Sequence, residues 1–188
     1  LKYVKDLAAE GVFEITLLGQ NVNQYGQDCR EIPFYKLLEK TASITGLKKI
    51  NFLTSHPMDF NTEIIDVIND NSNISRSIHL PLQSGSDPVL KAMNRKYTIS
   101  DYYRIFNTIT AKLDDFSIST DLIVGFPGET EQDYYNTLKA VKEIKFDEAF
   151  MYSYSPREGT PACSIKEELT RAEKIERLNE LITLQRKI

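Results

Sequence analysis

The sequence predicts an α/β protein built on parallel strands. Five segments rich in strand-forming residues alternate with segments of helical periodicity, and a further helix precedes the first of them. Each predicted strand ends in glycine or polar residues, although the strands themselves are largely apolar. No long linker, repeat or low-complexity tract interrupts this alternation. The pattern alone does not choose between a closed (β/α) barrel and an open, doubly wound sheet.

The helices are predicted from apolar periodicity and from residues that start or stop a helix. They cover residues 1–10, 33–45, 61–69, 100–112, 129–143 and 170–188, with a short helix after Asp87-Pro88. Gly11 suits the end of the first helix, and Ser100 suits the N-cap of the helix that follows it. Thr170 and Glu173 form a capping-box pattern at the start of the last helix.

The strands are predicted at residues 13–18, 50–55, 77–83, 117–125 and 147–155. In parallel α/β folds, ligands bind at the carboxyl ends of the strands. The segments that follow the strands are therefore the candidate site: GQN at 19–21, TSHP at 54–57, QSGS at 83–86, GFPGE at 125–129 and SYSPR at 153–157. Each glycine-containing segment alone is equally typical of a tight turn. No GxGxxG or GxxxxGK[ST] is present, which argues against a dinucleotide or P-loop site.

Composition excludes several classes of protein. The 188 residues, 41% of them hydrophobic and 27% charged, suit one globular domain spanning residues 1–188, and no apolar run is long enough to cross a membrane. The net charge of −4 shows no basic excess of the kind that general nucleic-acid binders carry. Cys29 and Cys163 are far apart and have no CxxC pattern, so we expect neither a disulfide nor a metal site, and a cytoplasmic location.

Individual side chains leave alternatives open. His79 lies within a strand, where a hydrogen-bonded interior histidine is the usual case, whereas His56 follows a strand and suits either a functional or a turn-stabilising role. Arg95 is either a surface charge or a ligand for a carboxylate or phosphate. Tyr152 and Tyr154 alternate with serines, so we expect one pair to face the lumen and the other the helices. No GxSxG is present to indicate a hydrolase.

Together, the strand ends resemble a known family. The segments LLGQNVNQYG, TSHP, HLPLQSGSDPVLKAMNRKYT, DLIVGFPGETEQDY and YSPREGTPA are similar, in order and spacing, to the radical-SAM methylthiotransferases. The resemblance covers essentially all 188 residues. Within the family, GQNVN and YSPREGT are most similar to the branch that acts on dimethylallyladenosine in tRNA.

The resemblance implies an incomplete parallel (β/α) barrel, a partial TIM barrel of the radical-SAM type. It also implies an enzyme, a transferase that adds a methylthio group to a modified adenosine next to the anticodon, with S-adenosylmethionine (SAM) and 4Fe–4S clusters as cofactors. The implied partner is tRNA, held mainly by an N-terminal cluster domain and a C-terminal TRAM domain that the chain lacks. Sister branches, acting on threonylcarbamoyladenosine or on a ribosomal-protein aspartate, are the alternatives, as is a noncatalytic SAM- or RNA-binding barrel.

The chain departs from the family pattern in one respect. The CxxxCxxC loop and the barrel's first strand would precede Leu1, and neither Cys29 nor Cys163 replaces them. We therefore expect an excised fragment that assembles no cluster, contains no catalytic residue or metal ligand of its own and shows no turnover.

The family pattern implies roles for particular residues. Gly19, Gln20 and Asn21 occupy the place that grips the methionine amino group, although Gln-Asn stands here instead of the commoner Gly-Glu. The ribose or the methionine carboxylate is assigned to Gln83, Ser84 and Arg95. Adenine and ribose are assigned to Asp121, Gly125 and Tyr154. The substrate side is assigned to His56 and Arg157.

Overall fold

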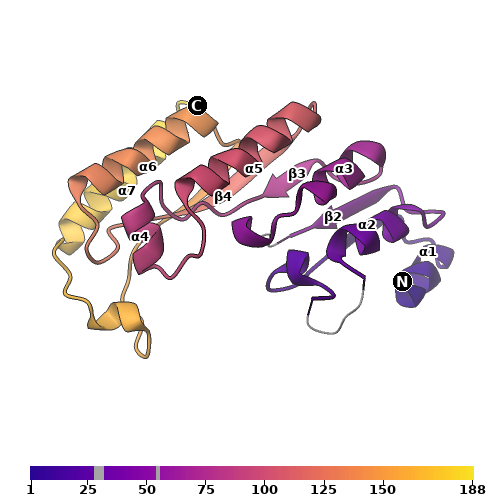
Figure 1. Cartoon of the computed structure of the whole chain (residues 1–188), viewed down its shortest axis with the longest axis horizontal. Coiled ribbons are helices and arrows are strands. Elements are labelled where there is room, and N and C mark those ends of the chain that lie inside the picture. Colours follow the sequence, from indigo (N-terminus) through magenta and orange to yellow (C-terminus); the bar gives the residue numbers. More distant parts are fainter. Residues whose placement is uncertain (28–31, 54–55) are drawn as a thin grey trace. The chain divides into compact units, whose positions relative to one another are not determined.

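A computed structural model describes residues 1–27, 32–53 and 56–188 of the chain (Figure 1). The chain divides into two compact units, one formed by residues 1–80 and 104–117 and the other by residues 81–103 and 118–188. Among the described residues, no helix has both the length and the apolar character needed to cross a membrane.

The first unit alternates helices and strands in the predicted order. Its elements are α1 (Lys2–Ala9), β1 (Glu14–Leu17), the 3₁₀ turn η1 (Val22–Gln24), α2 (Phe34–Ala42), β2 (Lys49–Phe52), the 3₁₀ turn η2 (Pro57–Asp59), α3 (Thr62–Asp70) and β3 (Ser77–His79). Strands β1 and β2 pair in parallel, with Ile15 opposite Ile50. Leu38, Ile50 and Ile64 are almost completely buried, so α2, β2 and α3 contribute to one apolar core.

The second unit carries the longer strands. Its elements are α4 (Asp87–Ala92), the start of α5 (Ile99–Lys112), β4 (Ser117–Val124), α6 (Glu131–Ile144), β5 (Glu148–Ser153), the 3₁₀ turn η3 (Pro161–Ser164) and α7 (Arg171–Gln185). Strands β4 and β5 pair in parallel, with Asp121 opposite Phe150 and Ile123 opposite Tyr152. Helices α6 and α7 lie side by side (Figure 1), and α7 also contacts β5.

Burial alternates along β4 with a period of two residues. Ile118, Thr120, Leu122 and Val124 are buried, whereas the residues between them are partly exposed. Alternate side chains of a strand point to opposite faces, so one face of β4 belongs to the core and the other is open. The open face is where the second unit has room for a ligand.

The predicted strands at 13–18, 117–125 and 147–155 are confirmed to within two residues at each end, but the strand predicted at 77–83 is shorter. Regular pairing stops at His79, two residues before Pro81, which has no N–H to donate to a ladder. Gln83 then forms an isolated parallel bridge with Leu122. The last two residues of the strand predicted at 50–55 lie outside the described residues.

Two helices are confirmed but begin one and two residues away from their predicted starts. Helix α5 begins at Ile99 and not after Ser100, because the Thr98 hydroxyl accepts the Asp101 N–H at 3.1 Å while the Asp101 carboxylate accepts the Thr98 N–H at 3.0 Å. Helix α6 begins at Glu131 and not at Glu129, because Thr130 forms a capping box with Asp133. The capping box predicted at the start of α7 is confirmed.

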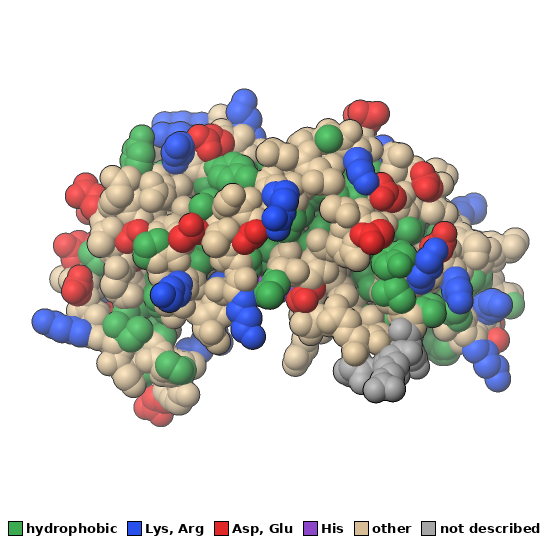
Figure 2. Space-filling model, viewed as in Figure 1, with side chains coloured by type: hydrophobic (Ala, Val, Ile, Leu, Met, Phe, Trp, Pro, Cys, Tyr) green, Lys and Arg blue, Asp and Glu red, His purple; other side chains and the backbone are tan. Residues whose placement is uncertain are grey.

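Charged side chains of both signs are interspersed over the face shown in Figure 2. No basic stripe stands out on this face, in keeping with the net charge of −4. On this face, recognition of an anionic ligand would therefore depend on a few local cations.

Candidate functional site

The second unit contains a cavity of about 760 Å³ at the open side of β4 and β5. Its volume lies within the range of about 300–1,000 Å³ that is typical of small-molecule sites. It is lined by Gln83, Ala92, Met93, Asn94, Arg95, Asp121, Ile123, Phe126, Tyr152, Ser153, Tyr154, Ser155, Arg157, Thr160, Pro161 and Ala162. Five residues predicted for the site from sequence are thus brought together: Gln83, Arg95, Asp121, Tyr154 and Arg157.

Gln83 enters the cavity wall in a left-handed backbone conformation. Its φ is +67°, which costs a residue with a Cβ atom about 1–2 kcal/mol. Two hydrogen bonds to β4 hold it there: its N–H donates to the Asp121 carbonyl at 2.8 Å, and its own carbonyl accepts the Ile123 N–H at 2.9 Å. Strand β4 therefore fixes the backbone position from which the Gln83 side chain projects. Backbone strain of this kind is often found at ligand sites.

Two arginines give the cavity its cationic character. Arg95 follows Asn94, whose φ of +56° turns the chain after α4, and Arg157 lies in the segment after β5. Within the described part of the chain, neither guanidinium group has an ion-pair partner. Both can therefore take a carboxylate or phosphate group of a ligand in the fork geometry that guanidinium favours.

The Tyr154 ring is held in place by two neighbours. Its centroid lies 5.0 Å from that of Phe126 in an edge-to-face arrangement, and the Lys174 ammonium lies 5.2 Å from it. The hydroxyl is buried and has no hydrogen-bond partner among the described residues. Burial raises the pKa of Tyr154, so the hydroxyl remains a proton donor that lacks an acceptor.

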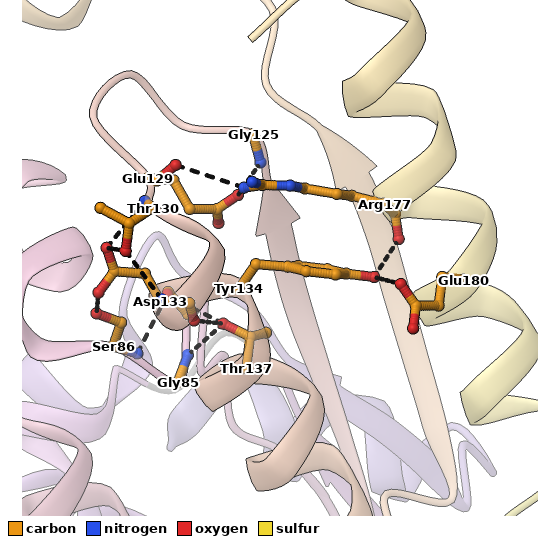
Figure 3. A network of polar contacts seen from close by, with 11 residues as sticks. Gly85, Ser86, Gly125, Glu129, Thr130, Asp133, Tyr134, Thr137, Arg177 and Glu180 are labelled. Atoms are coloured by element: carbon orange, nitrogen blue, oxygen red, sulfur yellow. Dashed lines mark hydrogen bonds and ion pairs between the residues drawn. The ribbon is translucent and has the colours of Figure 1, made fainter. Parts of the chain in front are cut away.

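A buried ion pair supports the end of β4 (Figure 3). Glu129 is 4% exposed, and its Oε2 accepts the Gly125 N–H at 2.7 Å and the Arg177 Nη1 at 2.6 Å. Burial raises the pKa of Glu129, and these two donors oppose that shift without cancelling it. The pair connects the loop after β4 to α7, 48 residues further along the chain. Sequence reasoning included Glu129 in the segment after the strand but missed Arg177, since nothing near Arg177 in the sequence marks it.

Gly125 is required by conformation and by space. Its φ is +70°, and a Cβ atom at this position would lie 2.6 Å from Lys174 Cγ. Lys174 is itself buried, ion-paired with Glu167 and packed on Tyr154, so its stem cannot simply move aside. Gly125 does not line the large cavity, and its predicted cofactor contact remains a prediction.

The QSGS segment packs against α6 (Figure 3). A Cβ atom on Gly85 would lie 2.5 Å from the Asn136 carbonyl, and the Gly85 N–H donates to Thr137 Oγ1 at 3.0 Å. Ser84 is fully buried, with its hydroxyl 3.3 Å from Thr137 Oγ1. The structure therefore gives Ser84 a packing role, and its role toward a ligand remains a prediction.

The remaining predicted residues belong to the first unit. Asn21 Nδ2 donates to Asp59 Oδ2 at 2.6 Å, which ties the loop after β1 to η2, while Asn21 Oδ1 is buried without a partner among the described residues. His56 Nδ1 accepts the Met58 N–H at 3.3 Å and lies 3.9 Å from Asp59 Oδ2. The turn-stabilising interpretation of His56 is thus supported. The ligand roles of Gly19, Gln20, Asn21 and His56 remain predictions.

Thiolate ligands are sparse in the described residues. Cys163 is a free, exposed thiol, and Cys29 lies outside the described residues. In residues 1–27, 32–53 and 56–188 there is no group of three or more His, Cys, Asp or Glu side chains arranged to hold a metal ion. These residues do not fit an iron–sulfur cluster, which needs several thiolates at one place.

Comparisons with solved structures show the fold. Coproporphyrinogen III oxidase (HemN) from Escherichia coli, described as a radical SAM enzyme, matches 99% of the chain with a TM-score of 0.66 at 18% sequence identity, over 44% of its own length. Methylornithine synthase (PylB) matches 98% of the chain with a TM-score of 0.61 at 13% identity, over 53% of its length. The chain is thus an α/β fold with parallel strands that corresponds to part of the barrel of radical SAM enzymes.

Comparisons with curated sequences are more specific. The Radical SAM superfamily matches residues 1–141. The tRNA-2-methylthio-N(6)-dimethylallyladenosine synthases of Caldicellulosiruptor saccharolyticus and Thermoanaerobacter pseudethanolicus are 47% and 49% identical over 98% of the chain, which covers 40% of each relative. The corresponding synthase of Natranaerobius thermophilus is 47% identical over the whole chain, which covers 42% of it. The chain belongs to the Radical SAM superfamily, and over nearly its whole length it is similar to these synthases.

Proposed function

We propose that the cavity at β4 and β5 binds SAM, and that the chain is the central catalytic domain of a tRNA methylthiotransferase acting on dimethylallyladenosine. The observation that carries the proposal is an identity of 47% with such a synthase over 98% of the chain. The chain spans about two fifths of the length of the curated relatives it matches, so the activity is proposed for the longer protein. A cytoplasmic location and tRNA as partner follow from the same proposal.

The residues of the cavity support this assignment through their chemistry. Arg95 lines the cavity with no ion-pair partner in the described chain, which supports a role in holding the methionine carboxylate. Gln83 offers a carboxamide to the ribose hydroxyls from a position fixed by β4. Tyr154 contributes an aromatic wall and backbone groups for the adenine edge.

Ser84 and Gly125 act behind this wall. Ser84 fastens the segment after Gln83 to α6, and the Gly125 N–H bonds the buried Glu129. Both therefore set the position of the strand ends that the ligand meets. Asp121 lies on the same open face and lines the cavity.

The described residues hold no thiolate set for a cluster, so we propose that a CxxxCxxC segment outside this chain supplies it. Such a cluster would supply the radical chemistry when SAM is bound. The residues of this chain bind and orient the cofactor and exclude water around it.

Calorimetric titration of SAM into the protein tests the cavity. Loss of a charged hydrogen-bond partner weakens binding by about 1.5–3 kcal/mol, so Arg95→Ala is expected to raise the Kd for SAM at least tenfold. Arg171→Ala, at the exposed start of α7, is the matched control and leaves the Kd unchanged. Equal Kd values for the two variants would refute the assignment of the cavity.

Analysis of modified nucleosides tests the substrate. A strain lacking the gene is expected to lose the methylthio derivative of dimethylallyladenosine and to keep that of threonylcarbamoyladenosine. The opposite loss would move the protein to the sister branch. If the strain keeps both methylthio nucleosides but its ribosomal-protein aspartate is not methylthiolated, the protein belongs to the branch that acts on that aspartate.

A further inference from the structure

We propose that Tyr152 is the platform on which the target base of the RNA stacks, a role that rests on the proposed function and adds a substrate-binding residue to it. Tyr152 lines the cavity, and its side chain is 54% exposed. It lies near the carboxyl end of β5, opposite Ile123 of β4.

The contrast with Tyr154 identifies Tyr152 as the residue available to a ligand. Tyr154 is packed on Phe126 and faces Lys174, so its ring belongs to the wall of the site. The Tyr152 side chain has no ring contact, hydrogen bond or ion pair with any residue in the described part of the chain, although its backbone pairs with β4. An aromatic ring that is exposed inside a cavity offers its face to a planar ligand.

The position along β5 separates this ring from the proposed cofactor contacts. Tyr152 lies two residues before Tyr154, or roughly 7 Å along a strand that rises about 3.3 Å per residue. Tyr154 is the proposed contact of the cofactor adenine, at the carboxyl end of the strand. A second planar group can therefore lie on Tyr152, next to the cofactor and not in its place.

The charge of the cavity favours a nucleotide as the second occupant. Arg157 lines the same cavity and has no ion pair among the described residues, so it can take a backbone phosphate. Stacking on an aromatic ring combined with a phosphate contact is the usual way in which proteins hold an unpaired nucleotide. Tyr152 and Arg157 supply these two contacts from one strand and the segment that follows it.

A single tryptophan provides the test, because the sequence contains none. Tyr152→Trp keeps an aromatic platform and makes it fluorescent. The ligand is an RNA stem-loop with dimethylallyladenosine in its loop, and the control ligand is the same stem-loop with an abasic site at that position. Tyr135→Trp, on α6 at 57% exposure, is the matched control protein.

We expect saturable quenching of Tyr152→Trp by the complete stem-loop, much weaker quenching by the abasic stem-loop, and none in Tyr135→Trp. S-adenosylhomocysteine is expected not to reverse the quenching. Equal quenching by both stem-loops, no quenching, or reversal by S-adenosylhomocysteine would each overturn the proposal.

Anisotropy of a labelled stem-loop gives a second measurement. Tyr152→Ala is expected to weaken binding about tenfold and Tyr152→Phe to leave it nearly unchanged, because stacking needs the ring and not the hydroxyl. Arg157→Ala is expected to reduce the slope of log Kd against log salt by about 1. If SAM binds normally and Tyr152→Ala matches the wild type, this inference fails while the proposed function stands. Failure of SAM to bind counts against the proposed function instead.

Discussion

Replacing Gly125 by alanine, and comparing it with the same change at Gly128, separates two reasons for a glycine in this loop: a positive φ and a lack of space for a Cβ atom. Gly125 and Gly128 both have positive φ, +70° and +84°, so alanine is strained at either position by about 1–2 kcal/mol. A Cβ atom on Gly128 would meet nothing within 4 Å, whereas one on Gly125 would lie 2.6 Å from Lys174 Cγ. Overpacking of this kind costs about 1–3 kcal/mol more.

We therefore expect Gly125→Ala to lower the free energy of unfolding by about 2–5 kcal/mol, and Gly128→Ala by about 1–2 kcal/mol. The effect of alanine on the unfolded chain is the same at both positions and cancels in the comparison. Urea denaturation followed by circular dichroism measures the difference. At a slope of about 1–3 kcal/mol per molar urea, the two midpoints are expected to differ by about 1 M.

A second substitution tests the stated cause. Lys174→Ala removes Cγ and Cδ, the atoms nearest the added methyl group, so Gly125→Ala should cost little more than Gly128→Ala in that background. Equal midpoints for Gly125→Ala and Gly128→Ala, or a full penalty that persists without the Lys174 stem, would refute the packing argument.

Two further predictions concern buried charges. Glu129→Ala leaves Arg177 largely buried without its partner and is expected to lower the free energy of unfolding by about 3 kcal/mol, whereas Glu39→Ala, in an exposed pair with Lys36, changes it by less than about 1 kcal/mol in the same urea experiment. Burial raises the pKa of Asp133, but hydrogen bonds from Ser86 and Thr130 outweigh burial and lower the pKa below its usual value of 3.8. The ionised carboxylate therefore stabilises the fold fully above pH 3.8, and this stabilisation is lost as the pH falls through the lowered pKa. Asp133→Asn is expected to make stability less dependent on pH in this acid range, and an unchanged pH profile of the melting temperature would contradict this.

The alternation of helices and strands, and the capping box at Thr170, could be read from the sequence because they depend on residues close together in the chain. The start of a helix was predictable where the sequence offers a single capping residue. The N-cap predicted at Ser100 was wrong because Thr98 and Asp101 form a reciprocal pair of hydrogen bonds there. The segments that contribute residues to the site, those after the strand ends, could likewise be predicted from the sequence. Parallel strands bring their carboxyl ends to one edge whatever the details of packing.

The sequence by itself thus determined the order of elements, the family, and the set of polar segments that surround the candidate site. Only the tertiary structure decided which of their side chains face the cavity. Gln83 is held there by β4, Ser84 is turned away toward α6, and Tyr152 is left exposed while Tyr154 is packed. These differences depend on contacts between residues tens of positions apart, and neither periodicity nor spacing carries that information. The ion pair of Glu129 and Arg177 also depends on the tertiary structure. Nothing in the sequence distinguishes either residue from a surface charge, and only the folded chain buries the two against each other.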